Sequence, residues 1–134
     1  MEIPKYHETF IPVLEILFLE ESLHSRELGS RIREKYYSKL PLDLLGKKTS
    51  SGANVLLDRI GWGKSYLKMA KFVSYPKRGM VQITDKGKKV LQKGTLSLAE
   101  LQSDRDFIEY RLSAKAKKEN ELVEETISVE NASP

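Results

Sequence analysis

A short stretch in the middle of the chain, residues 75–84 (YPKRGMVQIT), predicts a β-hairpin in a sequence whose other apolar residues mostly recur at helical spacing. Pro76 and Gly79 are typical of a tight turn, because proline presets φ and glycine accepts a positive φ. The flanking residues FVSY and MVQI would form two short strands. The turn itself holds two cations, Lys77 and Arg78. Any fold for this chain must therefore display a positively charged hairpin tip.

The first helix is predicted over residues 5–20. Pro12 is best tolerated in a first turn, so the regular part of this helix should begin near Thr9 or Phe10. Its apolar residues recur at helical spacing and should face the core. They are Phe10, Val13, Leu14, Leu17 and Phe18.

A short strand at residues 22–25 and a second helix follow. Ser25 is a candidate N-cap, because its hydroxyl can accept a hydrogen bond from a free amide of the first turn. Leu28 and Ile32 mark the buried face of this helix, which should end near Tyr37. The next residues contain proline, glycines and a Thr-Ser run, so they are predicted to be mainly loop.

The third helix is predicted over residues 53–71. Gly61 and Gly63 flank Trp62, and each glycine should cost about 1 kcal/mol relative to alanine in a helix interior. The sequence therefore indicates either a close approach of neighbouring backbone or a bend. We expect Trp62 to pack into the protein, as large aromatic side chains at helical spacing usually do. The predicted buried stripe is Leu56, Leu57, Ile60, Leu67 and Ala70.

Thr84 is a candidate N-cap for a fourth helix directly after the hairpin. The order helix, strand, helix, loop, helix, hairpin, helix is that of a winged helix-turn-helix, a mainly α fold with a small β-hairpin (α+β). In that fold the third helix enters the DNA major groove, and the hairpin, called the wing, contacts the backbone or the minor groove. We predict this domain at residues 1–94, a C-terminal helical extension at residues 95–122, and a disordered tail or a linker toward a missing domain at residues 123–134.

The net charge of +4 is unevenly distributed. Residues 46–94 carry twelve Lys or Arg and two acids, whereas residues 1–45 and residues 95–134 are both net acidic. Such a concentration of positive charge attracts polyanions, so double-stranded DNA is the expected partner. The alternative is a solvated basic face without a partner.

The residues predicted to contact DNA come from three segments. Lys64 and Lys68 are four residues apart on one face of the third helix and suit phosphates or guanine edges. The wing tip suits phosphates, because a turn has little structural use for two cations. The loop at residues 47–52 could reach phosphates or simply be solvated. The full set is Lys64, Ser65, Lys68, Lys71, Lys77, Arg78, Asn54, Lys47 and Lys48.

Two further charged residues lie on the third helix. Asp58 would repel phosphate unless it pairs with a neighbour or accepts a hydrogen bond from a cytosine amine. Arg59 is predicted either to contact DNA or to form an ion pair with Glu27 or Glu34 of the second helix.

Little in the chain indicates catalysis. It has no cysteine, and His7 and His24 lack metal-ligand spacing. The acids of residues 104–111 (DRDFIEYR) are predicted to form a solvated helix face rather than a nuclease metal site. We expect no enzyme activity in this chain, no cofactor, no metal and no small-molecule substrate. No apolar run is long enough for a membrane span, and these features fit a cytoplasmic protein of a bacterium or archaeon.

Several of these residues together resemble the N-terminal domain of Mrr-type restriction system proteins. The family pattern combines an Arg-x-Gly-Trp segment, a Tyr-Leu-Lys helix end, a Pro-Lys-Arg-Gly turn and a Thr-x-x-Gly helix start. The likeness covers about residues 4–94, and the combination is more specific than any single piece. The matching residues are Arg59, Gly61 and Trp62; Tyr66, Leu67 and Lys68; Pro76 to Gly79; and Thr84 with Gly87.

The resemblance implies a winged helix that binds DNA. In full-length members a nuclease domain of the PD-(D/E)xK class follows and cleaves modified DNA. The chain is therefore expected to be a fragment that positions a separate nuclease domain on duplex DNA, modified DNA included. One position departs from the pattern, because the family usually has glycine where this chain has Lys71. We expect a different geometry at that helix end.

Two alternatives stay open. A small winged-helix transcriptional regulator would use the same surface without a nuclease. A dimerisation module would instead pair a tail helix, predicted from Asp104 to about Glu119, across a twofold axis through Phe107, Ile108 and Leu112. An autonomous nuclease would require magnesium-dependent cleavage by this chain alone, and we expect none.

Overall fold

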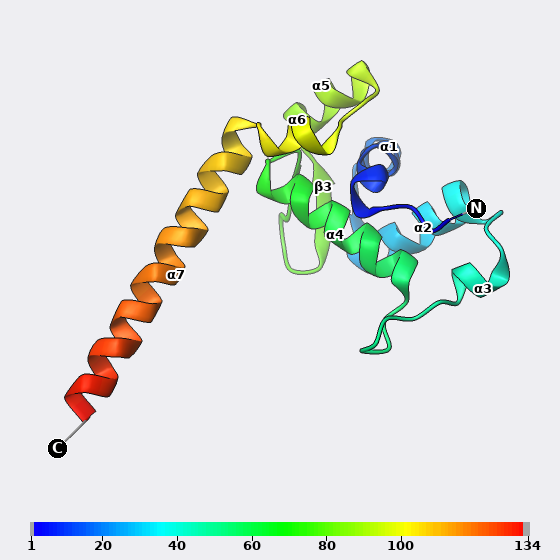
Figure 1. Ribbon diagram of the computed structural model, residues 1–134. Helices are drawn as coiled ribbons and strands as arrows, with labels where there is room; N and C mark the ends of the chain where they lie inside the picture. Colours follow the sequence, from blue (N-terminus) through cyan, green and yellow to red (C-terminus); the bar gives the residue numbers. More distant parts are fainter. Residues whose placement is uncertain (1, 133–134) are drawn as a thin grey trace.

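The computed structural model describes residues 2–132, and the side chains of residues 2–118. Helices predominate around a small antiparallel sheet, which confirms the predicted α+β class, and the predicted order of elements is observed (Figure 1). The elements are η1 (Tyr6–Thr9), α1 (Phe10–Glu20), β1 (Ser22–His24), α2 (Ser25–Tyr37), α3 (Leu42–Leu45), α4 (Val55–Met69), β2 (Val73–Ser74), β3 (Met80–Ile83), α5 (Asp85–Lys93), α6 (Leu98–Gln102) and α7 (Arg105–Ala132).

The sheet joins the strand before α2 to the hairpin. Its strand order is β1-β3-β2, and both pairs are antiparallel. Leu23 of β1 lies opposite Val81 of β3, and Val73 of β2 lies opposite Ile83 of β3. All four side chains are buried. The hairpin is therefore anchored to the core at its base.

The core lies between α1, α2, α4 and the sheet. The prediction that Phe18 belongs to the core is wrong. This side chain is 54% exposed in the last turn of α1, on a side that no described residue covers. The largest fully buried side chains are Phe10, Phe107, Leu14, Leu17, Leu28, Ile32, Leu56, Leu67 and Leu101.

Three predicted boundaries differ from the structure. His24, not Ser25, is the N-cap of α2, since its Nδ1 accepts a hydrogen bond from the Arg26 amide at 3.2 Å. The predicted loop before α4 contains the single turn α3. The last helix, α7, extends to Ala132 instead of ending near Glu119. A link to a further domain stays a prediction, and residues 133–134 lie outside the described residues.

A close approach of backbone explains one of the two glycines in α4. A Cβ on Gly63 would lie 2.1 Å from Thr9 Oγ1 and 2.8 Å from the Tyr6 carbonyl oxygen. Any side chain at this position would therefore push η1 away from α4. Gly61 has no atom within 4 Å of its Cβ position, so packing does not explain it.

A group of charges at the start of α7, here named the Lys86 cluster (Lys71, Lys86, Asp104 and Asp106), attaches that helix to the domain. Lys86 Nζ donates hydrogen bonds to the Ala70 carbonyl at 2.6 Å, to Asp104 at 2.6 Å and to Asp106 at 2.8 Å. From there α7 extends away from the other elements (Figure 1). Neither α7 nor any other described helix has the length and apolar character that a membrane crossing requires.

Candidate nucleic-acid interface

The wing tip is a closed turn with two exposed cations. The Met80 amide donates to the Lys77 carbonyl at 3.0 Å, and Gly79 takes the left-handed φ of 80° that such a turn needs. The Gly79 carbonyl accepts from the Ser25 amide at 2.9 Å, which holds the turn against the start of α2. Lys77 and Arg78 are exposed and take part in none of the ion pairs found among the described residues. Their charge is therefore available to an external anion.

The outer face of α4 meets the wing at Tyr75. The Nζ atoms of Lys64 and Lys68 each lie 5.6 Å from the centre of the Tyr75 ring, within cation–π range. Burial raises the pKa of the Tyr75 phenol, and its hydrogen bond with Ser65 acts in the opposite direction. The structure thus gathers three of the predicted residues of α4 around an aromatic ring that begins the wing turn.

Lys64 is partly buried in this arrangement. Burial lowers the pKa of its ammonium group, because removal from water disfavours the charged form. An anion placed beside Lys64 would oppose that effect and favour the charged form.

The prediction of a different backbone geometry at the end of α4 is wrong, because Lys71 adopts the left-handed conformation that a glycine would adopt. Its φ is 63°. The Lys71 amide donates to the Lys68 carbonyl at 3.0 Å, and the Phe72 amide donates to the Leu67 carbonyl at 2.9 Å. These two bonds form a Schellman motif. Lys71 Nζ also lies 3.7 Å from Asp106, so this predicted DNA contact already has a partner within the chain.

Asn54 and the loop before it shape the start of α4. Asn54 Oδ1 accepts from the Leu57 amide at 3.0 Å, and its Nδ2 donates to the Leu45 carbonyl at 2.7 Å, so both polar ends are used by the fold. Lys47 and Lys48 are exposed, and Lys48 forms an isolated β-bridge with Asn54. Their side chains lie near the beginning of α4, and contact with DNA stays a prediction.

Arg59 binds the N-terminal segment instead of the second helix. Its Nη1 donates to the carbonyls of Ile3 at 3.1 Å and Pro4 at 3.2 Å, and the predicted ion pair with the second helix is not formed. Glu27, one of the two predicted partners, pairs with Arg31. Arg59 therefore has a structural role that no local pattern in the sequence indicates.

The prediction for Trp62 is wrong. This residue is 52% exposed, and Leu57, which was expected in the buried stripe, is 38% exposed. Trp62 lies two residues after Ile60 and therefore points about 200° around the helix from the core. The spacing of the smaller apolar residues indicates this orientation, because Ile60 and Leu67 define the core-facing side of α4 and Trp62 lies on the opposite side. The buried residues of α4 are Val55, Leu56, Ile60, Gly63 and Leu67.

The acids at the start of α7 are engaged with cations. Asp104 and Asp106 both bind Lys86, and Glu109 lies 3.6 Å from Arg105. Within the described residues, no three or more His, Cys, Asp or Glu side chains gather as a metal site would require.

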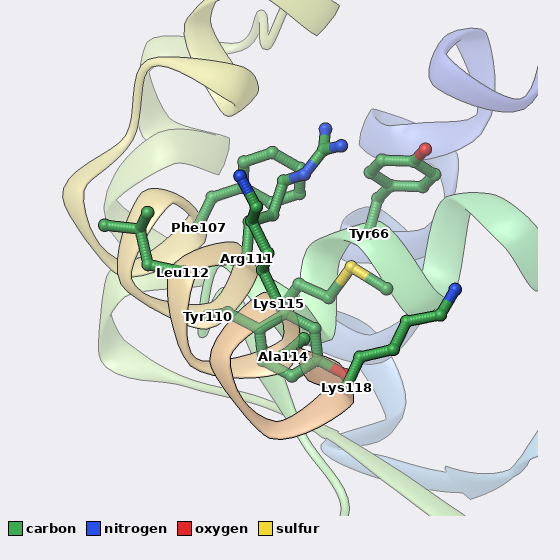
Figure 2. Close-up of a pocket in the computed structure, with 9 residues that line it drawn as sticks. Tyr66, Phe107, Tyr110, Arg111, Leu112, Ala114, Lys115 and Lys118 are labelled. Carbon is green, nitrogen blue, oxygen red and sulfur yellow. The ribbon is translucent and has the colours of Figure 1, made fainter. Parts of the chain in front are cut away.

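A groove of about 580 Å³ lies between α4 and α7. Tyr66 and Phe107 contribute aromatic rings, stacked with centroids 5.7 Å apart, and Arg111, Lys115 and Lys118 add cations along α7 (Figure 2). The groove therefore combines apolar surface with positive charge.

Comparison with known proteins identifies the family to which the sequence belongs. A family model described as the Mrr N-terminal domain matches residues 6–93, from η1 to the end of α5 and about two thirds of the chain. All nine residues predicted to contact DNA lie inside the matched segment. No curated protein and no solved structure gave a significant match.

Proposed function

Because the chain belongs to the Mrr N-terminal domain family, we propose that it binds duplex DNA as a winged helix and positions a separate nuclease domain there. The family associates the chain with Mrr-type restriction systems. In this proposal α4 enters the major groove and the wing follows the phosphate backbone. The proposed targets include duplexes with modified bases, as the resemblance to Mrr-type restriction system proteins implies. We assign no catalytic step to this chain and place its action in the cytoplasm.

The observation that carries the proposal is that two cationic elements, α4 and the wing, lie next to each other at Tyr75. Lys64 and Lys68 on α4 flank Tyr75, and the wing tip with Lys77 and Arg78 follows Tyr75 directly in the chain. None of the four cations has an acidic partner among the described residues. A surface that leaves four charges unpaired repels itself unless a polyanion covers it.

Salt dependence is the quantitative expectation. If about five to seven phosphates are contacted, the slope of log K against log salt should be about −0.9 for each contact. The expected measurement is fluorescence anisotropy of a labelled random duplex at two salt concentrations. Binding that weakens steeply with salt supports the proposal, and absence of binding at low salt contradicts it.

A matched pair of variants tests the surface. Lys77→Glu/Arg78→Glu reverses two charges on the wing, and Lys88→Glu/Lys89→Glu reverses two exposed charges on α5, which lies away from the wing tip (Figure 1). The wing variant should lose binding and the α5 variant should keep most of it. Equal losses would mean that net charge, and not this surface, determines binding.

We also propose a second candidate function, self-association through α7. Of the three residues predicted for this contact, Ile108 and Leu112 are 44% and 62% exposed, but Phe107 is not available because it is buried against Tyr66. Residues 111–118 carry four cations, whereas residues 119–130 carry five glutamates and no cation. Two antiparallel copies of α7 would therefore bring a segment of net positive charge beside one of net negative charge.

Sedimentation equilibrium over a wide concentration range tests self-association. A dimer mass that Leu112→Glu reduces to that of a monomer supports it. A monomer mass at every concentration contradicts it and leaves the DNA proposal untouched.

A further inference from the structure

An apolar patch lies within the cationic surface of α4. Trp62 and Leu57 are 52% and 38% exposed, and with Asp58 they border a shallow hollow of about 360 Å³. At Gly61, between them in sequence, no described residue outside its own helical turns comes within 4 Å of the Cβ position, so the hollow is open. No described residue covers this patch. Leaving an indole and a leucine in water forgoes the stabilisation of burial, so the patch indicates a partner that covers it.

The surroundings of the patch select a polyanion. Lys64 borders the same hollow, and Lys68 lies one turn further along α4. A protein partner with an apolar surface would have to be strongly acidic to accept these cations, whereas duplex DNA offers negative charge in any case. In the major groove, the alkyl group that the four standard bases present is the C5-methyl group of thymine.

We propose that Trp62 and Leu57 contact thymine methyl groups in the major groove and give the chain a preference for T·A pairs. This inference rests on the proposed function and names the base chemistry that the same surface reads. Asp58 lies one helical turn before Trp62 and is exposed. A carboxylate there would be repelled by phosphates, but it can accept a hydrogen bond from the adenine amino group that a T·A pair presents in the same groove.

Thymidine and deoxyuridine differ only by the C5-methyl group, so they isolate the contact. The experiment uses two labelled duplexes of the same A·T-rich sequence, one with every thymidine replaced by deoxyuridine, and the full chain at several salt concentrations. The thymine duplex should bind more tightly by about fourfold for each methyl group that is buried. The slope of affinity against salt should be the same for both duplexes, because the phosphates are unchanged.

Two variants connect the preference to the patch. Trp62→Ala/Leu57→Ala removes both exposed apolar side chains and should bind both duplexes with the same affinity, while its salt slope stays that of the wild type. Leu42→Ala is the control, because Leu42 is also exposed, at 86%, but lies on α3. It should keep the preference for the thymine duplex. Far-ultraviolet circular dichroism of each variant establishes that it is folded.

The outcomes separate the two levels of the argument. Salt-dependent binding with equal affinity for the two duplexes overturns the thymine contact and leaves DNA binding intact. A thymine preference that persists in Trp62→Ala/Leu57→Ala overturns the role of this patch. No binding to either duplex at low salt overturns the proposed function and this inference with it.

Discussion

The wing tip and the Lys86 cluster both present lysine nitrogen atoms near the surface, but their surroundings differ. Lys86 Nζ has two carboxylates and a carbonyl within 2.8 Å and lies 4.6 Å from the centre of the Phe72 ring. Lys77 and Arg78 have no such partner in the described part of the chain. The chain therefore supplies the counter-charge for one region, whereas its described residues supply none for the other.

This difference also refines the charge distribution of the sequence. Three cations of residues 46–94 pair with acids of the following segment: Lys71 and Lys86 with Asp106, and Lys93 with Glu100. The positive charge counted along the sequence thus overstates what DNA would meet. In the proposed function, the cations of α4 and the wing tip are the ones expected to contact DNA.

The largest effect is expected from neutralising the wing tip. Lys77→Ala/Arg78→Ala removes two phosphate contacts, so the salt slope should become shallower by about 1.8 and affinity at 0.1 M salt should fall roughly 50-fold. The free energy of unfolding should change by less than about 0.5 kcal/mol, because both side chains are exposed. Anisotropy titrations and urea unfolding measure the two quantities. A loss of stability larger than this would mean that the wing tip is part of the fold.

The converse is expected at the Lys86 cluster. Lys86→Met keeps the aliphatic stem but removes the hydrogen bonds to Ala70, Asp104 and Asp106, so unfolding in urea should require about 1–2 kcal/mol less. DNA affinity should stay within about twofold of the wild type, because Lys86 is not on the α4 surface. Lys88→Met, at an exposed position of the same helix, is the control and should change neither quantity. A loss of DNA affinity in Lys86→Met equal to that of Lys77→Ala/Arg78→Ala would remove the distinction between the two regions.

Lowering the pH should weaken the contribution of the Lys86 cluster to the free energy of unfolding but leave that of the wing tip unchanged. The hydrogen bond from Lys86 lowers the pKa of Asp106 below its usual 3.8, and the bond from Lys93 lowers the pKa of Glu100. A carboxyl with a lowered pKa stabilises the fold above its unfolded pKa and loses that contribution as the pH falls through the folded value. The free energy of unfolding should therefore decrease below about pH 4, less steeply in Lys86→Met than in the wild type. In Lys77→Ala/Arg78→Ala the free energy of unfolding should depend on pH as in the wild type. A changed pH dependence in this variant would mean that the wing tip also pairs with a carboxylate in the fold.

Local patterns predicted most of the fold but not the partners of individual side chains. The hairpin, the order of the helices and the Thr84 cap follow from spacing and turn residues within a few positions of each other, and the structure agrees. The partners of Arg59 lie 55 and 56 residues away, where no periodicity reaches. Trp62 differs for another reason, because its position around the helix, and not its size, determines its exposure. Contacts between residues far apart in sequence, and the position of each residue around its helix, thus determine which side chains of α4 are exposed and which are held by the fold.

The smallest effect is expected at Lys71, which belongs to the Lys86 cluster and was also a predicted DNA contact. A side chain at φ 63° costs about 1–2 kcal/mol, which glycine avoids, although glycine loses more backbone entropy on folding. Lys71→Gly should therefore raise the free energy of unfolding by about 0.5 kcal/mol, measured in urea. Lys71→Ala keeps the strain and loses the 3.7 Å pair with Asp106, so it should give no such gain.

DNA affinity then assigns this lysine to one region or the other. If Asp106 already satisfies its charge, both substitutions should leave the anisotropy titration within about twofold of the wild type. If both weaken binding equally and make the salt slope shallower by about 0.9, Lys71 contacts a phosphate. The cationic surface would then extend from the wing past the end of α4, and an internal ion pair would no longer suffice to exclude a lysine from it.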